Sequence, residues 1–160
     1  MIKGKVMKNI LMAVVILSGI LVNCSQKGTN KSAPMEVENV AVLEVPSVQK
    51  TTAVFMTIRN NSADDDFLIG AQADIAEACE MHEMVMEGEV MRMQKLDSVE
   101  IPAGGSVEFK QGGLHLMLIN LKREIKTGES IKIMLKFKNS NEVEVTGMVH
   151  PLDHMHEHMH

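Results

Sequence analysis

Apolar and polar residues alternate with a period of two along most of the chain after residue 36. The clearest case is residues 131–138, where lysines and a methionine alternate with Ile131, Ile133, Leu135 and Phe137. Successive side chains of a strand point to opposite faces, so this pattern predicts a half-buried strand with a basic outer face. Residues 142–145 alternate glutamate with valine, and residues 139–141 predict a hairpin turn between the two runs. We expect the opposite charges of the two strands to pair.

The rest of the body also favours strands over helices. Further strands are predicted at Val37–Val45, Thr51–Arg59, Gln72–His82, Val90–Lys95, Val107–Lys110 and Leu114–Asn120. Turns are predicted at Asn60–Ser62, Pro102–Gly105 and Gln111–Gly113, and a solvated loop at Asp64–Asp66. No long helical period is present. Many short strands separated by turns predict an all-β domain, a sandwich or a barrel.

The N-terminus has the pattern of a targeting segment. Three lysines in the first eight residues precede an apolar run of 13 residues, Ile10–Val22, which is short for a membrane span. This pattern predicts a secretory signal peptide over residues 1–23. The run ends at Cys24, and residues 21–24 resemble the lipobox of bacterial lipoproteins, whose cysteine is lipidated. Because Asn23 stands where a small residue is usual, an ordinary signal peptide cleaved elsewhere is the alternative.

The predicted organisation follows from this leader. Residues 24–35 are polar and small and predict a flexible tether, residues 36–149 a single β-domain, and residues 150–160 a separate tail. We therefore expect a membrane-anchored lipoprotein facing the periplasm or the cell exterior. If Cys24 carries lipid, Cys79 has no disulfide partner within the chain.

Composition excludes one class of partner and identifies an unusual residue. The net charge is −5, aromatic residues make up 2% of the chain, and Trp and Tyr are absent. Nucleic-acid binders need basic grooves and aromatic platforms, so no nucleic-acid partner is expected. Methionine is abundant, with 15 residues, and many lie close to a histidine in sequence. Some methionines fill gaps in a core, but core packing does not explain this clustering.

Two short segments predict a site for a soft metal ion. In the strand at residues 114–118, His115 and Met117 share one face, while the leucines point the other way, into the core. The second segment, residues 81–93, holds His82 and the methionines Met84, Met86, Met91 and Met93. Thioether sulfur favours Cu(I), and imidazole is an acceptable partner. Residue chemistry alone leaves the choice among these methionines open.

The spacing of these residues resembles that of the PCuAC family of periplasmic copper chaperones. Ten residues separate His82 from Met93, 21 separate Met93 from His115, and one separates His115 from Met117. Residues 101–105 (IPAGG) and 112–117 (GGLHLM) also look like the family, and the likeness extends over about 37–149. It implies a cupredoxin-like Greek-key β-sandwich in which His82, Met93, His115 and Met117 bind Cu(I).

The same resemblance implies partners. Family members bind Cu(I) outside the cytoplasm and pass it to the copper centre of cytochrome c oxidase. They do so directly or with a Sco-type thiol protein. The resemblance leaves Met84, Met86 and Met91 outside the ligand set. For these three we favour packing, or a soft rim around the metal, over direct ligation.

Cys79 suggests a rival interpretation, a blue-copper electron carrier with Cys79 and His82 as ligands. Two observations count against it. His82 is the first histidine of the chain, with about 70 residues of domain after it, and Cys79 and His82 face opposite sides of a continuous strand. We expect Cys79 to pack in the core.

The C-terminus predicts a second metal-binding region. Within residues 150–160 lie five histidines and two methionines: His150, His154, Met155, His156, His158, Met159 and His160. Spaced histidines suit Cu(II), Ni(II) or Zn(II), and methionine adds capacity for Cu(I). We expect this tail to capture copper and to raise its concentration near the core site.

Taken together, the sequence favours a metallochaperone, not an enzyme. No Ser/His/Asp triad and no pair of catalytic carboxylates stands out. The alternative is a lipoprotein that sequesters copper for tolerance, with the tail as a store.

Overall fold

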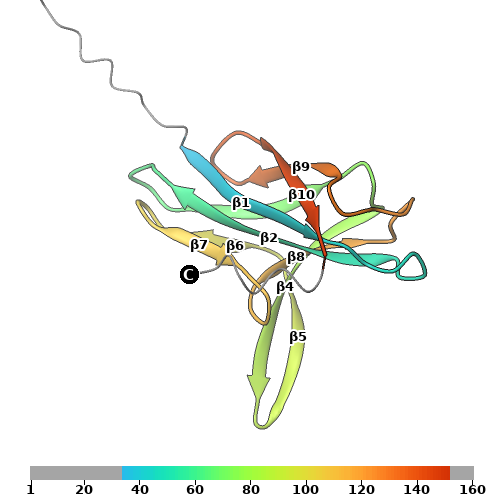
Figure 1. Ribbon diagram of the computed structural model, residues 1–160. Helices are drawn as coiled ribbons and strands as arrows, with labels where there is room; N and C mark the ends of the chain where they lie inside the picture. The colour runs from blue at the N-terminus through green and yellow to red at the C-terminus, as the bar shows by residue number, and fades with distance from the viewer. Residues whose placement is uncertain (1–33, 152–160) are drawn as a thin grey trace, which may run out of the picture. The chain divides into compact units, whose positions relative to one another are not determined.

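The computed structural model of the protein describes residues 34–151, and this part of the chain is built from strands alone (Figure 1). The all-β prediction is confirmed. The strands are β1 (Met35–Leu43), β2 (Thr51–Asn60), β3 (Asp66–Gln72), β4 (Ala78–Glu87), β5 (Val90–Leu96), β6 (Val99–Ile101), β7 (Ser106–Phe109), β8 (His115–Ile119), β9 (Ser130–Phe137) and β10 (Val143–His150). No helix within these residues is long and apolar enough to cross a membrane.

The strands form one continuous hydrogen-bonded order around a common core. That order is β5-β4-β8-β2-β1-β10-β9-β3-β6, and β7 also pairs with β2. β2 is central, because it pairs with β1 along one edge and with β8 and then β7 along the other. β1 and β10 run parallel, so the first and last strands lie side by side (Figure 1). The core between the strands is filled by side chains such as Ile58, Leu68 and Ile133.

The predicted hairpin is the antiparallel pair β9–β10. Ile131, Ile133, Leu135 and Phe137 are all buried, as the alternation predicts. The expected charge pairing is also confirmed, because Lys132 Nζ lies 2.8 Å from Glu144 Oε1 and Lys136 Nζ lies 3.8 Å from Glu142 Oε1.

The strand predicted at Gln72–His82 is wrong in its first half. β3 ends at Gln72, and residues 73–77 turn before β4 begins at Ala78. The turn is required because β3 pairs with β9 whereas β4 pairs with β8, so the chain must move to another part of the sheet. The turn is closed by the Ala76 amide, which donates to the Ala73 carbonyl.

The solvated loop predicted at Asp64–Asp66 is also corrected. Asp64 and Asp65 are exposed, but Asp66 begins β3 and is only 2% exposed. Its carboxylate accepts hydrogen bonds from the amides of Phe67 at 2.7 Å and Asn139 at 2.9 Å. Through these hydrogen bonds the buried carboxylate of Asp66 connects β3 to the β9–β10 loop. The sequence prediction missed β3 itself, as well as the three-residue β6.

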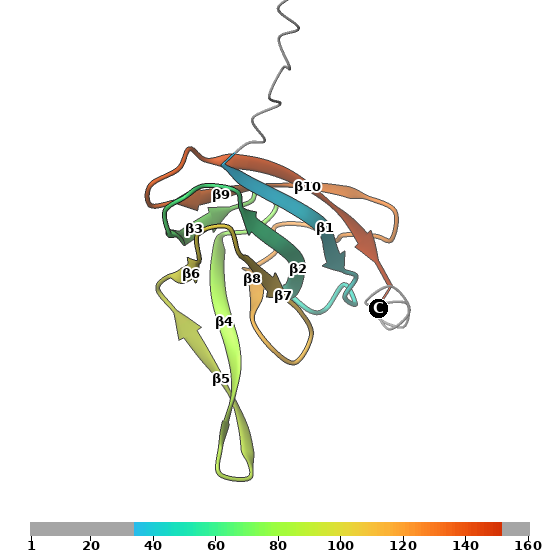
Figure 2. The ribbon, with the colours of Figure 1, turned by 90° about the vertical axis from the view of Figure 1, so that its left-hand side faces the viewer.

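β4 and β5 form a hairpin whose tip projects away from the other strands (Figures 1 and 2). Gly88, with a φ of 66°, occupies its two-residue loop. Glycine adopts this left-handed conformation without the steric cost that a Cβ brings.

Several predicted features lie outside the described residues. They are the signal peptide, Cys24, the tether up to residue 33, and residues 152–160 of the tail. His150, by contrast, is the last residue of β10 and pairs in register with Leu43.

Asp66 gives the domain a pH-dependent contribution to stability. Burial raises its pKa, but hydrogen bonds from Ser140, Asn139 and Phe67 outweigh burial and hold the pKa below the ordinary value. Its stabilising contribution is therefore present above the unfolded-state pKa of about 3.9 and is lost as pH falls through the lower folded-state value. We expect Asp66→Asn to lower the free energy of unfolding by about 1–3 kcal/mol at neutral pH.

The difference from wild type should shrink in strong acid, as measured by urea unfolding across a pH series. Asp64→Asn is the matched control, because Asp64 is exposed in the loop just before β3. A pH-independent difference for Asp66→Asn would contradict the assigned role.

Candidate metal centre

The two histidines of the predicted site are brought together by the pairing of β4 with β8. His82 lies directly opposite His115 in the antiparallel register. Side chains of directly opposed residues project to the same face of a sheet. The two rings are accordingly stacked, with centroids 6.2 Å apart and an angle of 23° between their planes.

Met117 occupies the next position along the same face. It follows His115 by two residues on β8, and it lies opposite Glu80 of β4 and Ala53 of β2. Leu116 and Leu118 point the other way and are fully buried, as the sequence predicts.

Met93 reaches the same face from β5. It pairs with Met84, and the neighbouring position on β5, Lys95, pairs with His82. Met93 is therefore a diagonal neighbour of His82, within the reach of a long side chain. Its side chain is 50% exposed.

A pocket of about 420 Å³ opens beside three of these four side chains; His82 does not line it. Met93, His115 and Met117 line it together with residues of the β1–β2 loop such as Val45 and Pro46. His115 faces away from the leucines as predicted, but it does not emerge at the surface. It is only 6% exposed, and it lines the pocket together with residues of β1, β2 and the loop between them.

Each histidine has a polar group beside one of its two ring nitrogens. His115 Nδ1 lies 2.9 Å from the Gly113 carbonyl. A carbonyl only accepts, so Nδ1 carries the proton, and the lone pair of the neutral ring is on Nε2. This backbone contact is a typical way of fixing the tautomer of a metal-binding histidine.

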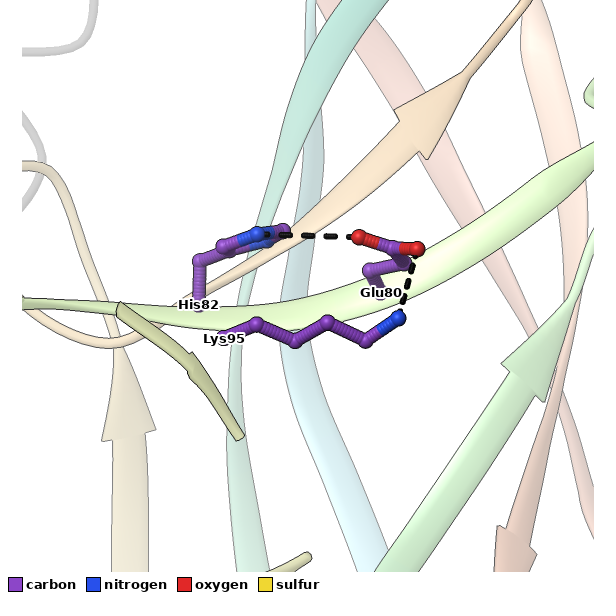
Figure 3. A network of polar contacts seen from close by, with 3 residues as sticks. All are labelled: Glu80, His82 and Lys95. Atoms are coloured by element: carbon purple, nitrogen blue, oxygen red, sulfur yellow. Dashed lines mark hydrogen bonds and ion pairs between the residues drawn. The ribbon is translucent and has the colours of Figure 1, made fainter. Parts of the chain in front are cut away.

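Glu80 plays the corresponding part for His82 (Figure 3). Glu80 Oε2 lies 3.6 Å from His82 Nε2, and Glu80 Oε1 accepts a hydrogen bond from Lys95 Nζ at 2.7 Å. The hydrogen bond from Lys95 holds the pKa of Glu80 below its ordinary value, so the carboxylate stays charged. A carboxylate beside Nε2 favours a proton there and leaves the lone pair on Nδ1.

His82 Nδ1 is the ring nitrogen that remains available to a ligand. It is buried, and nothing within residues 34–151 hydrogen-bonds to it. A buried polar atom without a partner costs free energy, and such atoms in native structures often mark a site for an ion or a water. A metal ion bound by His82 Nδ1, His115 Nε2 and the two thioethers would satisfy it. No group of three His, Cys, Asp or Glu side chains in the described part of the chain is placed to hold a metal.

Sequence analysis missed the groups that orient the two imidazoles. Glu80 precedes His82 by two residues, and alternation along the strand already places both on one face. Lys95 and the Gly113 carbonyl carry no such signal, because they meet the histidines only through the strand pairing and the turn before β8.

Cys79 packs on the other side of β4, against the core, as expected. Burial raises the pKa of its thiol to about 11, so the thiol is protonated at neutral pH. A blue-copper centre needs a thiolate ligand. The structure therefore favours the expectation that Cys79 is a packing residue.

Comparison with known proteins gives one family and several solved relatives. The family described as "Putative lipoprotein LpqE-like" matches residues 35–149. A curated protein from Leifsonia xyli subsp. xyli, also described as a "Putative lipoprotein", is 31% identical over 91 residues. The match covers 56% of this chain and 55% of the relative, so the chain spans about half the length of the curated relative it matches.

The similar structures are PCuAC domains and a protein from Deinococcus radiodurans. The copper-bound PCuAC domain from PmoF2 superposes with a TM-score of 0.65 at 18% identity, covering 74% of this chain and 94% of that domain. The Cu(I) form of DR1885 from Deinococcus radiodurans gives a TM-score of 0.63 at 30% identity, covering 78% and 84%. The expected cupredoxin-like sandwich is confirmed.

The hydrogen bond at His115 Nδ1 and the carboxylate 3.6 Å from His82 Nε2 predict opposite tautomers for the two rings. In the metal-free protein at mildly alkaline pH, His115 should carry its proton on Nδ1 and His82 on Nε2. Long-range ¹H–¹⁵N correlation spectra of the imidazoles distinguish the two forms. Finding the same tautomer in both rings would contradict this account of the site.

Proposed function

Because this chain belongs to the LpqE-like lipoprotein family, of the PCuAC type that its sequence resembles, we propose that it is an extracytoplasmic metallochaperone for Cu(I). The observation that carries the proposal is the pair of stacked imidazoles, with a buried His82 Nδ1 that has no hydrogen-bond partner among residues 34–151, near the thioethers of Met93 and Met117. The copper-bound domain of PmoF2 and the Cu(I) form of DR1885 support copper as the cargo.

The proposed ligands are His82, Met93, His115 and Met117. Two neutral nitrogens and two neutral sulfurs suit a soft, singly charged ion. Thioethers need no deprotonation, so acid competes for this site only through the imidazoles. A site without thiolate also cannot be lost to disulfide formation, which matters outside the cytoplasm.

The arrangement supports release as well as binding. The two imidazoles come from strands that are paired within the sheet and are sheltered, whereas Met93 is half exposed on the hairpin. An incoming ligand from a recipient can replace the Met93 thioether first while the imidazoles still hold the ion. A protein with this division of roles acts by ligand exchange and is not an enzyme.

Location and recipient complete the proposal. Cys24 is the proposed lipid attachment point, with residues 24–35 as the tether between membrane and domain; the lipoprotein descriptions of the family and of the curated relative support this. The proposed recipient is the copper centre of cytochrome c oxidase, reached directly or through a Sco-type thiol protein. The tail at residues 150–160 is proposed to capture copper, as Cu(I) or Cu(II), for the core site.

A second candidate function is copper sequestration for tolerance, favoured by the seven histidines and methionines of the tail. Transfer separates the two functions. The Cu(I)-loaded full chain is mixed with a purified oxidase copper domain, and metal in each protein is quantified after separation. A chaperone delivers the ion, whereas a store retains it.

The ligand set predicts the effect of removing both thioethers. Met93→Leu with Met117→Leu keeps the apolar volume but removes the two soft donors. Loss of two of the four ligands should weaken Cu(I) binding by at least about a hundredfold, at a cost per ligand of more than 1.4 kcal/mol. Competition with a Cu(I) chelator of known affinity measures this change.

The matched control is Met148→Leu, which removes an equally exposed thioether from β10. It should leave the tight binding unchanged. Wild-type affinity in the double variant would overturn the assignment of Met93 and Met117 as ligands.

Glu80 should contribute to affinity without binding the ion. Glu80→Gln removes the charge that favours the proton on His82 Nε2, and loss of such an orienting carboxylate typically costs about tenfold in metal affinity. Glu83→Gln is the control, because Glu83 lies on the same strand but on its opposite face. Equal affinities of the two variants in the chelator competition would show that Glu80 does not orient His82.

A further inference from the structure

The outer part of the β4–β5 hairpin is a two-stranded ribbon that leaves the sheet (Figure 2). β8 pairs with β4 only over Ala78–His82, whereas β5 pairs with β4 over Met81–Glu87. Beyond His82, β4 therefore has β5 as its one strand partner. The ribbon emerges next to the candidate metal centre.

One face of this ribbon carries four methionines in two adjacent cross-strand pairs. Met84 lies opposite Met93, and Met86 lies opposite Met91. The other face carries Val85 opposite Arg92 and Glu87 opposite Val90, with an ion pair of 3.0 Å between Arg92 and Glu87. A slip of one residue would put the methionines of the two strands on opposite faces. The register thus concentrates four thioethers on one surface.

Core packing does not account for this surface. Met86 is 63% exposed, Met91 is 52% exposed and Met93 is 50% exposed, and only Met84 is partly covered. We expected Met84, Met86 and Met91 either to pack or to form a soft rim around the metal. The exposure of Met86 and Met91 shows that these two are not packed in the core. The hairpin holds four of the large apolar side chains that are exposed in residues 34–151, and three of the four are methionine.

We propose that Met84, Met86 and Met91 form a second Cu(I) site on the hairpin, distinct from the centre at His82 and His115. Directly opposed side chains in a sheet have Cβ atoms about 5 Å apart, so three flexible thioethers of two neighbouring pairs can converge on one ion. Thioethers are soft, neutral donors that favour Cu(I) over harder cations. The site has no imidazole and binds Cu(I) more weakly than the inner centre.

The two sites share a boundary at Met93. Met93 belongs to the methionine face of the ribbon and is also a diagonal neighbour of His82. An ion can therefore pass between the hairpin and the inner centre by exchanging one thioether at a time. Copper stays Cu(I) throughout, and no proton or electron moves. This relay rests on the proposed function, whereas the existence of the hairpin site does not.

The test follows each methionine separately. The full chain, labelled with ¹³C at the methionine methyl groups, is titrated with Cu(I) under anaerobic conditions, and the methyl signals are assigned by single substitutions. The first equivalent should move the signals of Met93 and Met117, and further Cu(I) should move those of Met84, Met86 and Met91. The buried methyls of Met56 and Met81 should stay in place and report an intact fold.

The variant Met86→Leu with Met91→Leu removes two hairpin donors and keeps their apolar volume. It should lose the hairpin response and slow transfer of Cu(I) to a competing chelator, with the affinity of the first equivalent unchanged. Met148→Leu, which replaces a half-exposed methionine on β10, is the control and should change neither property.

Two outcomes separate this proposal from the proposed function. If the Met86 and Met91 methyls keep their metal-free positions in excess Cu(I), the hairpin site is wrong even when Met93 and Met117 respond. If the hairpin methyls respond and those of Met93 and Met117 do not, the hairpin site stands and the inner ligand set is wrong.

Discussion

The antiparallel register between β4 and β8 is the constraint on which the candidate centre depends. Backbone hydrogen bonds place His82 opposite His115, and the side-chain period of two then fixes every neighbour on that face. A shift of one residue would turn Met81, now in the core, toward the pocket and would bury His82 among aliphatic side chains. The core therefore enforces the geometry of the site, since only one register buries the apolar residues.

The proposed donors of the candidate centre differ in how firmly the fold holds them. His115 sits on a strand whose leucines are fully buried, and its ring is further fixed by the Gly113 carbonyl. Met93 lies on a ribbon that has left the sheet, with half of its surface in solvent. Firm imidazoles and a loosely held thioether suit a protein that must hold an ion selectively and still release it. Isolated two-stranded ribbons have little stability of their own, so the hairpin is the part of the candidate centre that can move most easily.

The Cys79 thiol and the Glu80 carboxylate lie near the candidate centre, but neither is a proposed ligand. The Cys79 thiol is turned to the core, where burial keeps it protonated, so it offers neither a competing ligand nor a disulfide partner. The carboxylate of Glu80 lies next to His82 and is paired with Lys95. We therefore assign Glu80 the role of orienting the His82 ring and not that of a ligand. The ion would thus meet neutral donors, while charge acts on it through the imidazole.

The sequence by itself determined the all-β class, the β9–β10 hairpin and the pairing of His115 with Met117 on one face. These features depend on the period of two, which is local. Only the tertiary structure decided that His82 faces His115, that Glu80 with Lys95 lies beside one ring, and that the β1–β2 loop lines the same pocket as the other. The burial of Asp66 and the turn at residues 73–77 belong to this second group. In each case the deciding contact joins strands that are distant in sequence, and local patterns carry no record of which strands will pair.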